Sequence, residues 1–325
     1  MNQPLKQIVF LDRATVAADM PPLHVPHAWT DHMASNPDDV VGRCRQAHVI
    51  VTNKVPLTAT AIAQLSKLEL VAIPATGMDH VDIHACAARG IPVLNCPDYS
   101  ALSVPEHAIA LAMALRRNLM GYWQDVSEGA WARARTFFTE LYPVTDLHGS
   151  RLGIIGSGDL GRRTAQLGQA FGMKVLHAER RGSVVTRPGY TPFEQVLGQA
   201  DVLSLHCPLT AETRGLIGER ELRAMKETAI VVNTARGGIV NEAALLKALE
   251  EGWIAGAALD VLEQEPPAAD HALLTKRRGN LIVTPHVAWR TQLSMQRLAG
   301  QLIENIERHL RAQNTLANSQ NVETP

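Results

Sequence analysis

The chain has 325 residues, a formal net charge of −1, a hydrophobic content of 46% and a charged content of 19%. The near-zero charge excludes a general binder of nucleic acids, because neutralising phosphates requires a surplus of Lys and Arg. The composition is that of a globular protein rather than a disordered or fibrous one, and the length favours roughly two domains.

No stretch of the sequence has the apolar length of a membrane span, and the early run from Ile8 to Leu11 is too short for a secretory signal. The chain has four cysteines, which form no Cys-x-x-Cys pair: Cys44, Cys86, Cys96 and Cys207. We therefore expect reduced thiols, a cytoplasmic location and no membrane partner.

The first part of the chain alternates short apolar strands with helical stretches. Strands are predicted at Ile8 to Leu11, Val49 to Val51, Leu70 to Ile73 and Pro92 to Leu94. This alternation is typical of a parallel α/β domain. A second and clearer alternation follows, with strands predicted at Leu152 to Ile155, Lys174 to His177, Val202 to His206, Ala229 to Asn233, Ala255 to Asp260 and Leu281 to Thr284. Such a series with intervening helices is the pattern of a doubly wound dinucleotide-binding fold.

A long helix is predicted where the two alternations meet. Ser103 to Glu106 has the pattern of a capping box with an early proline, and the apolar helix His107 to Leu119 follows it. A second long helix is predicted from Thr291 to Arg311, and the polar tail after it is expected to fray. These two helices suggest that the chain leaves its first domain and returns to it, so that residues 1–100 and 288–325 form one domain and residues 101–287 the other.

Gly156, Gly158 and Gly161 stand at a predicted strand-to-helix turn. The first permits a tight turn, the second lets the backbone approach a pyrophosphate, and the third allows close helix packing, while the amino end of the helix favours the anion. A glycine turn also occurs in other α/β proteins, but the strand, helix and acid that surround this one favour a dinucleotide site.

Glu179 ends the next strand, near the distance at which an acid binds the adenosine ribose hydroxyls. A carboxylate there favours NAD, because it repels the 2′-phosphate of NADP. Arg180 and Arg181 leave NADP open, because a guanidinium can stack on the adenine or accommodate that phosphate.

Arg236, Glu265 and His286 each follow a predicted strand. Arg236 lies in a glycine-flanked turn, where a guanidinium can grip a carboxylate through two parallel hydrogen bonds. Glu265 precedes two prolines, and His286 follows Pro285. Each of the three could be an ordinary surface or structural residue, but three at consecutive strand ends beside a cofactor crevice indicate chemistry on a small acid.

His80 and His84 are four residues apart with Asp82 between them, and on a helix they would share one face. A zinc site normally has a third ligand, and none is evident, so no metal is expected.

The chain resembles the D-isomer-specific 2-hydroxyacid dehydrogenases over nearly its full length. The matching stretches are Gly153 to Gly161, His206 to Thr210, Asn233 to Val240, Asp260 to Pro267, and Pro285 with His286. Within the family it looks most like the bacterial glycerate dehydrogenases, or hydroxypyruvate reductases, at Val9 to Arg13, Asn53 to Pro56, Ala75 to Gly77 and Pro285 to Trp289.

The resemblance implies an α/β fold with two Rossmann-like domains, one flavodoxin-like and one doubly wound and NAD-binding, with a cleft between them. The discontinuous domain would be the substrate-binding (catalytic) domain and residues 101–287 the NAD(P)-binding domain. The implied reaction is NAD(P)H-dependent reduction of hydroxypyruvate to D-glycerate, and of glyoxylate to glycolate.

The resemblance also implies which residues form the site. Arg236 would hold the substrate carboxylate, Glu265 would bind one ring nitrogen of His286, and His286 would donate the proton. Reduction would then need a charged His286, so its rate should fall as rising pH removes that proton. The implied substrate-binding residues are Lys54, Thr76, Gly77, Arg236 and Trp289. The implied cofactor-binding residues are Gly156, Ser157, Gly158, Asp159, Leu160, Gly161, Glu179, Arg180, His206, Cys207, Pro208, Thr213, Thr234, Ala235, Arg236 and Asp260.

The chain departs from the family pattern in three places. Asp159 stands where members often carry a basic residue, and its charge should weaken binding of the pyrophosphate unless Arg162 offsets it. Glu179 replaces the commoner aspartate. Trp289 should narrow the pocket toward a small substrate, although a tryptophan here could also anchor an interface.

Other functions stay open at this level. Another small 2-hydroxy acid could be the substrate, and a nucleotide-sensing corepressor or scaffold of the same fold would keep the same three residues. Formate dehydrogenases carry glutamine where Glu265 stands, and phosphoglycerate dehydrogenases usually add a regulatory domain. The family also implies a homodimer, with His107 to Leu119 and the arm Trp123 to Phe138 at the interface.

Overall fold

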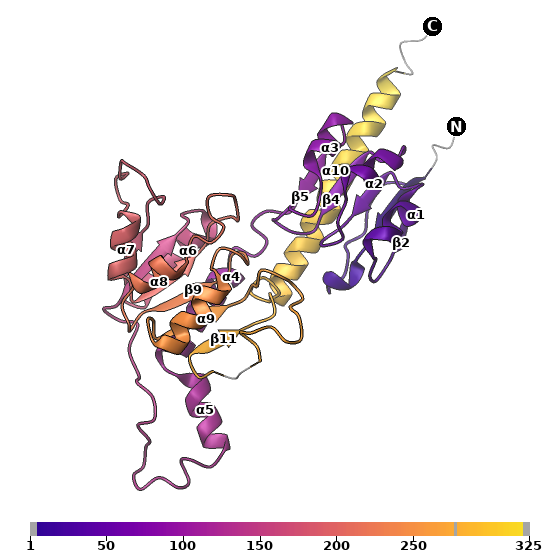
Figure 1. Ribbon diagram of the computed structural model, residues 1–325. Coiled ribbons are helices and arrows are strands. Elements are labelled where there is room, and N and C mark those ends of the chain that lie inside the picture. The colour runs from indigo at the N-terminus through magenta and orange to yellow at the C-terminus, as the bar shows by residue number, and fades with distance from the viewer. Residues whose placement is uncertain (1–4, 276–277, 321–325) are drawn as a thin grey trace. The chain divides into compact units, whose positions relative to one another are not determined.

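The computed structural model describes residues 5–275 and 278–320, and the side chains up to residue 315 (Figure 1). The chain forms two compact units, Met1–Ser100 with Arg290–Pro325, and Ala101–Trp289. Within the described ranges, no helix combines the length and apolar character needed to cross a bilayer.

The first unit is built on a five-stranded parallel sheet in the order β2-β1-β3-β4-β5. This is the flavodoxin-like strand order. The strands are β1 (Lys6–Phe10), β2 (His27–Asp31), β3 (Val49–Val51), β4 (Leu70–Ile73) and β5 (Val93–Asn95), and the short helices are α1 (Val40–Cys44), α2 (Ala59–Gln64) and α3 (Ile83–Ala88).

Strand β2 was missed by the sequence analysis. It pairs only with β1, so it is an edge strand, and none of its residues is buried. An edge strand needs no continuous apolar run, and His-Ala-Trp-Thr-Asp contains none.

Helix α10 (Gln292–Gln320) returns the chain to the first unit and packs on β4. Buried side chains recur every four residues along it, at Leu298, Leu302, Ile306 and Leu310, which is the spacing of one helix face. The expectation of a frayed tail from residue 312 was wrong as far as Gln320, because the helix continues to that residue. Residues 321–325 lie outside the described part of the chain.

The second unit has a six-stranded parallel sheet in the order β11-β10-β9-β8-β6-β7. Its strands are β6 (Arg151–Ile155), β7 (Lys174–His177), β8 (Val202–Leu205), β9 (Ile230–Asn233), β10 (Gly256–Leu259) and β11 (Leu281–Val283). The chain runs outward from β6 to β7 and then crosses to β8 on the other side of β6. The strand order therefore reverses between β6 and β8, and in such sheets ligands bind at the carboxyl ends beside that point.

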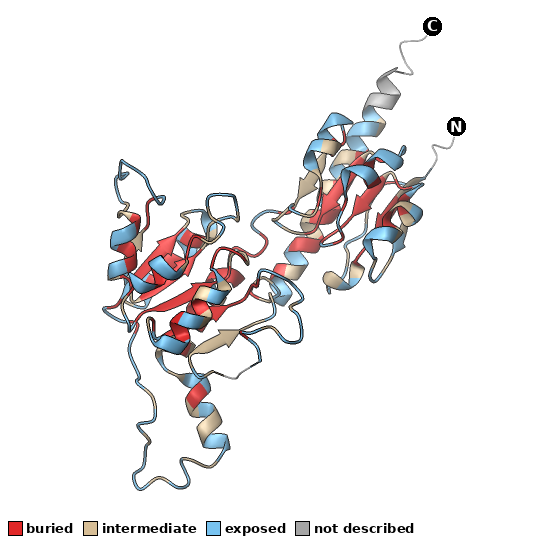
Figure 2. Ribbon diagram, in the orientation of Figure 1, coloured by how far each residue is buried: buried red, intermediate tan, exposed pale blue. Residues whose placement is uncertain are grey.

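Helices cover both faces of this sheet, so every residue of β8, β9 and β10 is buried (Figure 2). One face packs against α4 (Ser103–Arg116) and α6 (Asp159–Ala170), and the other against α7 (Phe193–Gln199), α8 (Glu219–Arg223) and α9 (Glu242–Glu251). The predicted α/β class, with two parallel-sheet domains, is confirmed.

The predicted boundaries of the first long helix were wrong. Leu102 is the N-cap of α4 and Ser103 is already its first residue, so the expected capping box is not formed. The helix ends at Arg116, because Asn118 adopts a left-handed backbone with a φ of 48°, and a separate helix α5 (Leu119–Ser127) follows. Figure 1 shows α5 and the loop after it extending away from the sheet of their unit.

Candidate active site

The turn between β6 and α6 has the geometry of an anion cradle. Gly156 has a φ of 94°, which favours glycine, and Gly158 is the N-cap of α6. A Cβ on Gly161 would lie 2.0 Å from the Gly156 carbonyl oxygen, so only glycine lets the helix pack this closely on the turn. A Cβ on Gly158 would meet nothing within 4 Å, so the backbone there is open to a ligand.

Three buried polar atoms lie just beyond the carboxyl ends of strands β6, β8 and β9. They are Ser157 Oγ, His206 Nδ1 and Thr234 Oγ1, and none has a hydrogen-bond partner within the described ranges. Buried polar atoms are normally paired, so these three atoms favour a polar ligand at the strand ends. Together with the cradle, they fit the hydroxyl and phosphate groups of a dinucleotide.

His206 and Cys207 continue from β8 toward this cradle. Burial lowers the pKa of His206 to about 4, so the imidazole is neutral at neutral pH, and its Nε2 lies 2.9 Å from Ser204 Oγ. Burial also raises the pKa of Cys207 to about 11, which keeps its thiol protonated. The Thr213 hydroxyl donates to the Pro208 carbonyl oxygen at 2.6 Å, which closes the loop that follows.

Asp159 begins α6 and forms an ion pair with Arg162 one turn along the helix. The Arg162 guanidinium also donates to the Ser157 carbonyl oxygen at 3.1 Å. Arg162 therefore partly neutralises the negative charge of Asp159 beside the cradle, as the sequence analysis suggested.

Glu179 lies two residues beyond the end of β7 and is 5% exposed. Its carboxylate pairs with Arg187, at 2.8 Å from both Nε and Nη2, and this pairing lowers the pKa of Glu179 to about 2. The sequence analysis considered Arg180 and Arg181 as neighbours of this acid and missed Arg187. The only sequence signal for such a pair was the number of arginines in this segment.

Arg236 lies in the turn after β9, where Asn233 fixes the main chain. The Asn233 side chain donates to the Arg236 carbonyl oxygen at 2.9 Å and accepts from the Ala235 amide at 3.0 Å. The Arg236 guanidinium donates to the Ala235 carbonyl oxygen at 2.8 Å. Gly238 follows with a φ of 78°, so the turn requires a residue that tolerates this conformation.

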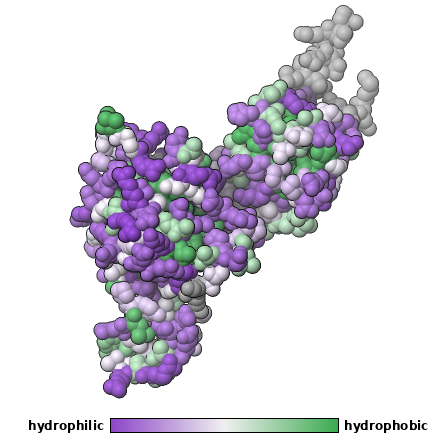
Figure 3. Space-filling view, viewed as in Figure 1, coloured by the Kyte–Doolittle hydropathy of each residue, from purple (hydrophilic) through white to green (hydrophobic). Residues whose placement is uncertain are grey.

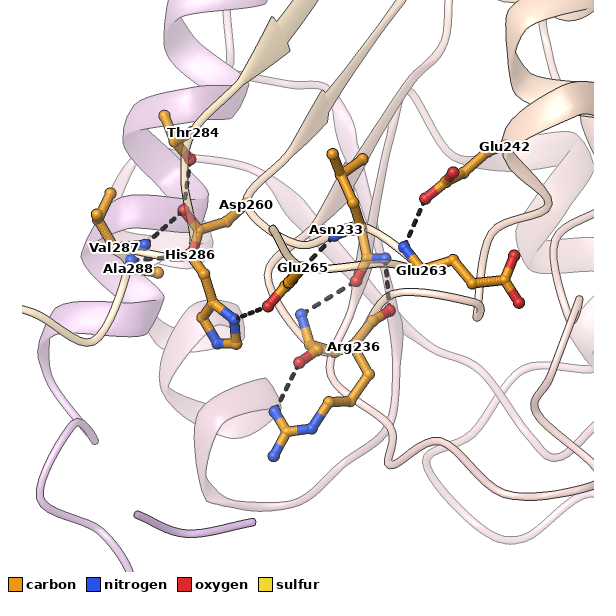
Figure 4. Close-up of polar contacts among 12 residues, drawn as sticks. Asn233, Arg236, Glu242, Asp260, Glu263, Glu265, Thr284, His286, Val287 and Ala288 are labelled. Atoms are coloured by element: carbon orange, nitrogen blue, oxygen red, sulfur yellow. Dashed lines mark hydrogen bonds and ion pairs between the residues drawn. The ribbon is translucent and has the colours of Figure 1, made fainter. Parts of the chain in front are cut away.

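Glu265 and His286 form a hydrogen-bonded pair after β10 and β11. Glu265 Oε2 lies 2.6 Å from His286 Nδ1, and Oε1 accepts from the Leu262 amide at 2.9 Å (Figure 4). An ionised carboxylate only accepts hydrogen bonds, so Nδ1 carries the proton and Nε2 is the atom left to exchange one with a substrate. Figure 4 shows the side chains of Arg236, Glu265 and His286 on the same side of these strand ends.

Asp260 holds the turn that carries His286. The buried Asp260 carboxylate accepts from the Val287 amide at 3.0 Å and the Ala288 amide at 2.9 Å, and it also accepts from the Thr284 hydroxyl. The His286 amide donates to the Asp260 carbonyl oxygen at 2.8 Å, and the residue adopts a φ of 52°. Asp260 was expected among the cofactor-binding residues, and that role stays a prediction. These bonds show that Asp260 fixes the His286 backbone.

The three substrate residues expected from the first unit follow neighbouring strands there. Lys54 comes after β3, and its amide donates to the buried Asp12 carboxylate at 2.7 Å. Thr76 and Gly77 come after β4, and the Thr76 carbonyl oxygen accepts from Asn95 Nδ2 at 2.8 Å. Their role in binding substrate, and that of Trp289, stays a prediction.

His80 and His84 do not share a helix face. His80 precedes α3, and its Nε2 lies 3.2 Å from the Thr52 carbonyl oxygen, whereas His84 is exposed on the helix. Among the residues that the structure describes, no group of three or more His, Cys, Asp or Glu side chains is placed to hold a metal.

Residues 109–288 match the family model of the D-isomer specific 2-hydroxyacid dehydrogenase, NAD binding domain. The chain belongs to this family. The enzyme is therefore an NAD-dependent oxidoreductase of 2-hydroxy acids, and the cradle at Gly156 lies inside the matched domain.

Similar proteins span nearly the whole enzyme. It is 44% identical to the glycerate dehydrogenase of Methylorubrum extorquens, over 93% of this chain and 95% of that one. It is 34% identical to the hydroxypyruvate reductase of Blautia hydrogenotrophica, over 84% of this chain and 85% of that one. The solved D-lactate dehydrogenase of Aquifex aeolicus, complexed with NAD and lactic acid, superimposes with a TM-score of 0.79 at 28% identity, covering 94% of this chain and 96% of that one.

Proposed function

We propose that this enzyme reduces hydroxypyruvate to D-glycerate with NADH or NADPH, and that it also reduces glyoxylate to glycolate. The observation that carries the proposal is the 2.6 Å pair of Glu265 and His286, in the same unit as Arg236 and the glycine cradle. The similarity to a glycerate dehydrogenase and a hydroxypyruvate reductase supports the choice of acid.

In this proposal Arg236, Glu265 and His286 have different roles in the reduction. When bound, the reduced nicotinamide supplies a hydride to the keto carbon. Arg236 binds the carboxylate of the acid through parallel hydrogen bonds and polarises its keto oxygen. His286 gives the proton on Nε2 to that oxygen, so hydroxypyruvate, NAD(P)H and one proton become D-glycerate and NAD(P)+. Glu265 keeps the ring oriented and stabilises its charged form.

The substrate residues Lys54, Thr76, Gly77 and Trp289 are part of the proposal. The amides of Thr76 and Gly77 would donate to the substrate carboxylate, and the indole of Trp289 would limit its size. The remaining cofactor residues named from the sequence belong to the proposal as well, with Ser157, His206 and Thr234 supported by their unpartnered buried atoms.

A direct assay tests the function. Purified enzyme is mixed with NADH or NADPH and one keto acid, and the loss of nicotinamide absorbance is followed. Hydroxypyruvate should give the highest kcat/KM and glyoxylate a lower one. Pyruvate is the informative competitor, because a neighbour in structure is a D-lactate dehydrogenase. A kcat/KM for pyruvate or phosphohydroxypyruvate above that for hydroxypyruvate would refute the proposed substrate.

We also propose a homodimer formed through the region from His107 to Leu119 and the arm from Trp123 to Phe138. Large hydrophobic side chains are exposed along the arm, including Trp123 at 64%, Trp131 at 56% and Phe137 at 87%, and Figure 3 shows hydrophobic surface there. Several large hydrophobic side chains exposed on one segment favour an interface. Light scattering should give twice the mass of 35.4 kDa, and Trp123→Ser with Phe137→Ser should lower it toward the monomer.

A cytoplasmic location completes the proposal. It is supported by the four free cysteines, of which Cys44, Cys86 and Cys96 are buried.

A further inference from the structure

The carboxylate of Glu179 has its hydrogen-bonding capacity filled by the protein itself. Oε1 accepts from the Arg180 amide at 2.9 Å and from Arg187 Nη2 at 2.8 Å. Oε2 accepts from the Arg187 amide at 3.1 Å and from Arg187 Nε at 2.8 Å. A carboxylate offers about four acceptor positions, so none is left for a ribose diol while Arg187 stays in place.

The main chain holds Arg187 against this acid. Tyr190 donates its amide to the Arg187 carbonyl oxygen at 3.0 Å, and Gly189 has a φ of 81°, so residues 187–190 form a β-turn with Pro188 at its second position. The turn leads back to β7, because Glu179 and Thr191 are joined by a backbone hydrogen bond of 2.8 Å. The Arg187 guanidinium also lies over the Tyr190 ring, 3.9 Å from its centroid.

The arginines of this segment are not equivalent. Arg181 pairs with Glu221 at 3.6 Å and is directed toward the Leu216 carbonyl oxygen. Arg180 is exposed, and among the described residues nothing accepts a hydrogen bond from its guanidinium. Arg187 uses two of its five guanidinium N–H donors on Glu179, so the others can bind an anion.

Glu179 stands where the glycine motif places the acid that reads the adenosine ribose. We propose that Arg187 is the residue that determines cofactor choice, because it occupies and neutralises Glu179 and, with Arg180, offers donors to a 2′-phosphate. Glu179 then acts as the anchor of Arg187 and does not select NAD. The enzyme should therefore accept NADPH and NADH with comparable affinity.

Equilibrium binding tests this without any keto acid, so the result does not depend on the proposed substrate. The Kd of NADH and of NADPH is measured by nicotinamide fluorescence at fixed ionic strength, because charge–phosphate contacts depend on salt. In the wild type the two Kd values should agree within about tenfold, which is about 1.4 kcal/mol. A Kd for NADPH more than a hundredfold above that for NADH would overturn the proposal.

Arg187→Ala should raise the Kd of NADPH by about tenfold or more, because it removes a ligand of the 2′-phosphate. It should lower the Kd of NADH, because it frees the Glu179 carboxylate for the ribose hydroxyls. Arg187→Lys keeps the positive charge but cannot bind both carboxylate oxygens in parallel. Its Kd values for NADH and NADPH should therefore lie between those of the wild type and those of Arg187→Ala. Equal changes in both Kd values for Arg187→Ala would contradict the proposal. Thermal unfolding of each variant identifies any loss of cofactor affinity that comes from misfolding. If Arg187→Ala misfolds, the Kd values of Arg187→Lys and Glu179→Gln test the proposal instead.

Glu179→Gln separates the two roles of the acid. If Glu179 binds the ribose diol, this change should raise the Kd of NADH by about tenfold or more. Under our proposal the Kd of NADH changes by less than about threefold and the Kd of NADPH does not rise. Arg223→Ala is the matched control, because Arg223 also pairs with a glutamate, Glu219, at 3.0 Å and lies over an aromatic ring, that of Trp253. It should leave the ratio of the two Kd values unchanged.

Discussion

Gly237 and Leu262 approach each other so closely that a Cβ on Gly237 would lie 1.8 Å from the Leu262 carbonyl oxygen. Gly237 follows Arg236, and the Leu262 amide donates to Glu265 Oε1 at 2.9 Å. The main-chain contact therefore joins the loop that carries Arg236 to the loop that carries Glu265, the partner of His286.

Gly237→Ala tests whether this contact sets the geometry of the site. The added methyl group must push the two loops apart, and a displacement of about 1 Å near reacting groups costs about a hundredfold in rate. We expect kcat/KM for hydroxypyruvate to fall by about that factor, with about 1–3 kcal/mol lost in unfolding free energy. Gly300→Ala is the control, because a Cβ there meets nothing within 4 Å and it lies in helix α10. Wild-type kinetics in Gly237→Ala would show that the loops are not coupled.

His286→Gln and Glu265→Gln separate proton donation from orientation. Loss of the general acid should lower kcat by about 10²–10⁴-fold and leave the Kd of NADH unchanged. Glu265→Gln keeps an acceptor for Nδ1 but removes the charge that favours the imidazolium. Its kcat should fall less than that of His286→Gln. A kcat for Glu265→Gln equal to that of the wild type would argue against the pair of Glu265 and His286 as the source of proton donation.

The strands with continuous apolar runs were predictable from the sequence, and the contacts made by loops were not. Strands β3 and β4 have the predicted bounds, because each is a short apolar run that is buried in a parallel sheet. Strand β7 also has the predicted bounds, although it is an edge strand with no buried residue. Arg236, Glu265 and His286 could be named as candidates from the sequence because each follows a predicted strand. The pairing of Glu179 with Arg187 depends on a turn that folds back eight residues later, and nothing local distinguishes Arg187 from Arg180 or Arg181.

Asp159→Arg tests the electrostatics of the glycine cradle. Asp159 pairs with Arg162, so the wild type presents little net charge at the start of α6. An arginine at this position would add a cation beside the pyrophosphate and release Arg162. We expect the Kd of NADH to fall by about three- to tenfold at low salt, and this gain should shrink as salt rises. Asp159→Asn should give a smaller gain. An unchanged Kd in both variants would mean that this charge does not reach the cofactor.

His206 should make the stability of the cofactor-free enzyme depend on pH. Its pKa is lowered by burial to about 4, from an ordinary value of 6.5. Between these two values the unfolded chain binds a proton that the folded chain does not, so stability is lost as pH falls from about 6.5 toward 4. Each unit of difference corresponds to about 1.4 kcal/mol. Solvent reaches part of the side chain, so we expect a loss on the order of 2 kcal/mol.

The measurement is urea unfolding of wild type and His206→Gln, without cofactor, at several pH values from 4.5 to 7.5. Glutamine does not titrate, so the free energy of unfolding of the variant should fall less on acidification, and the two curves should converge toward pH 4.5. The exposed His84 provides the control, since His84→Gln should keep the wild-type slope. Parallel curves for wild type and His206→Gln would mean that folding does not lower the pKa of this imidazole.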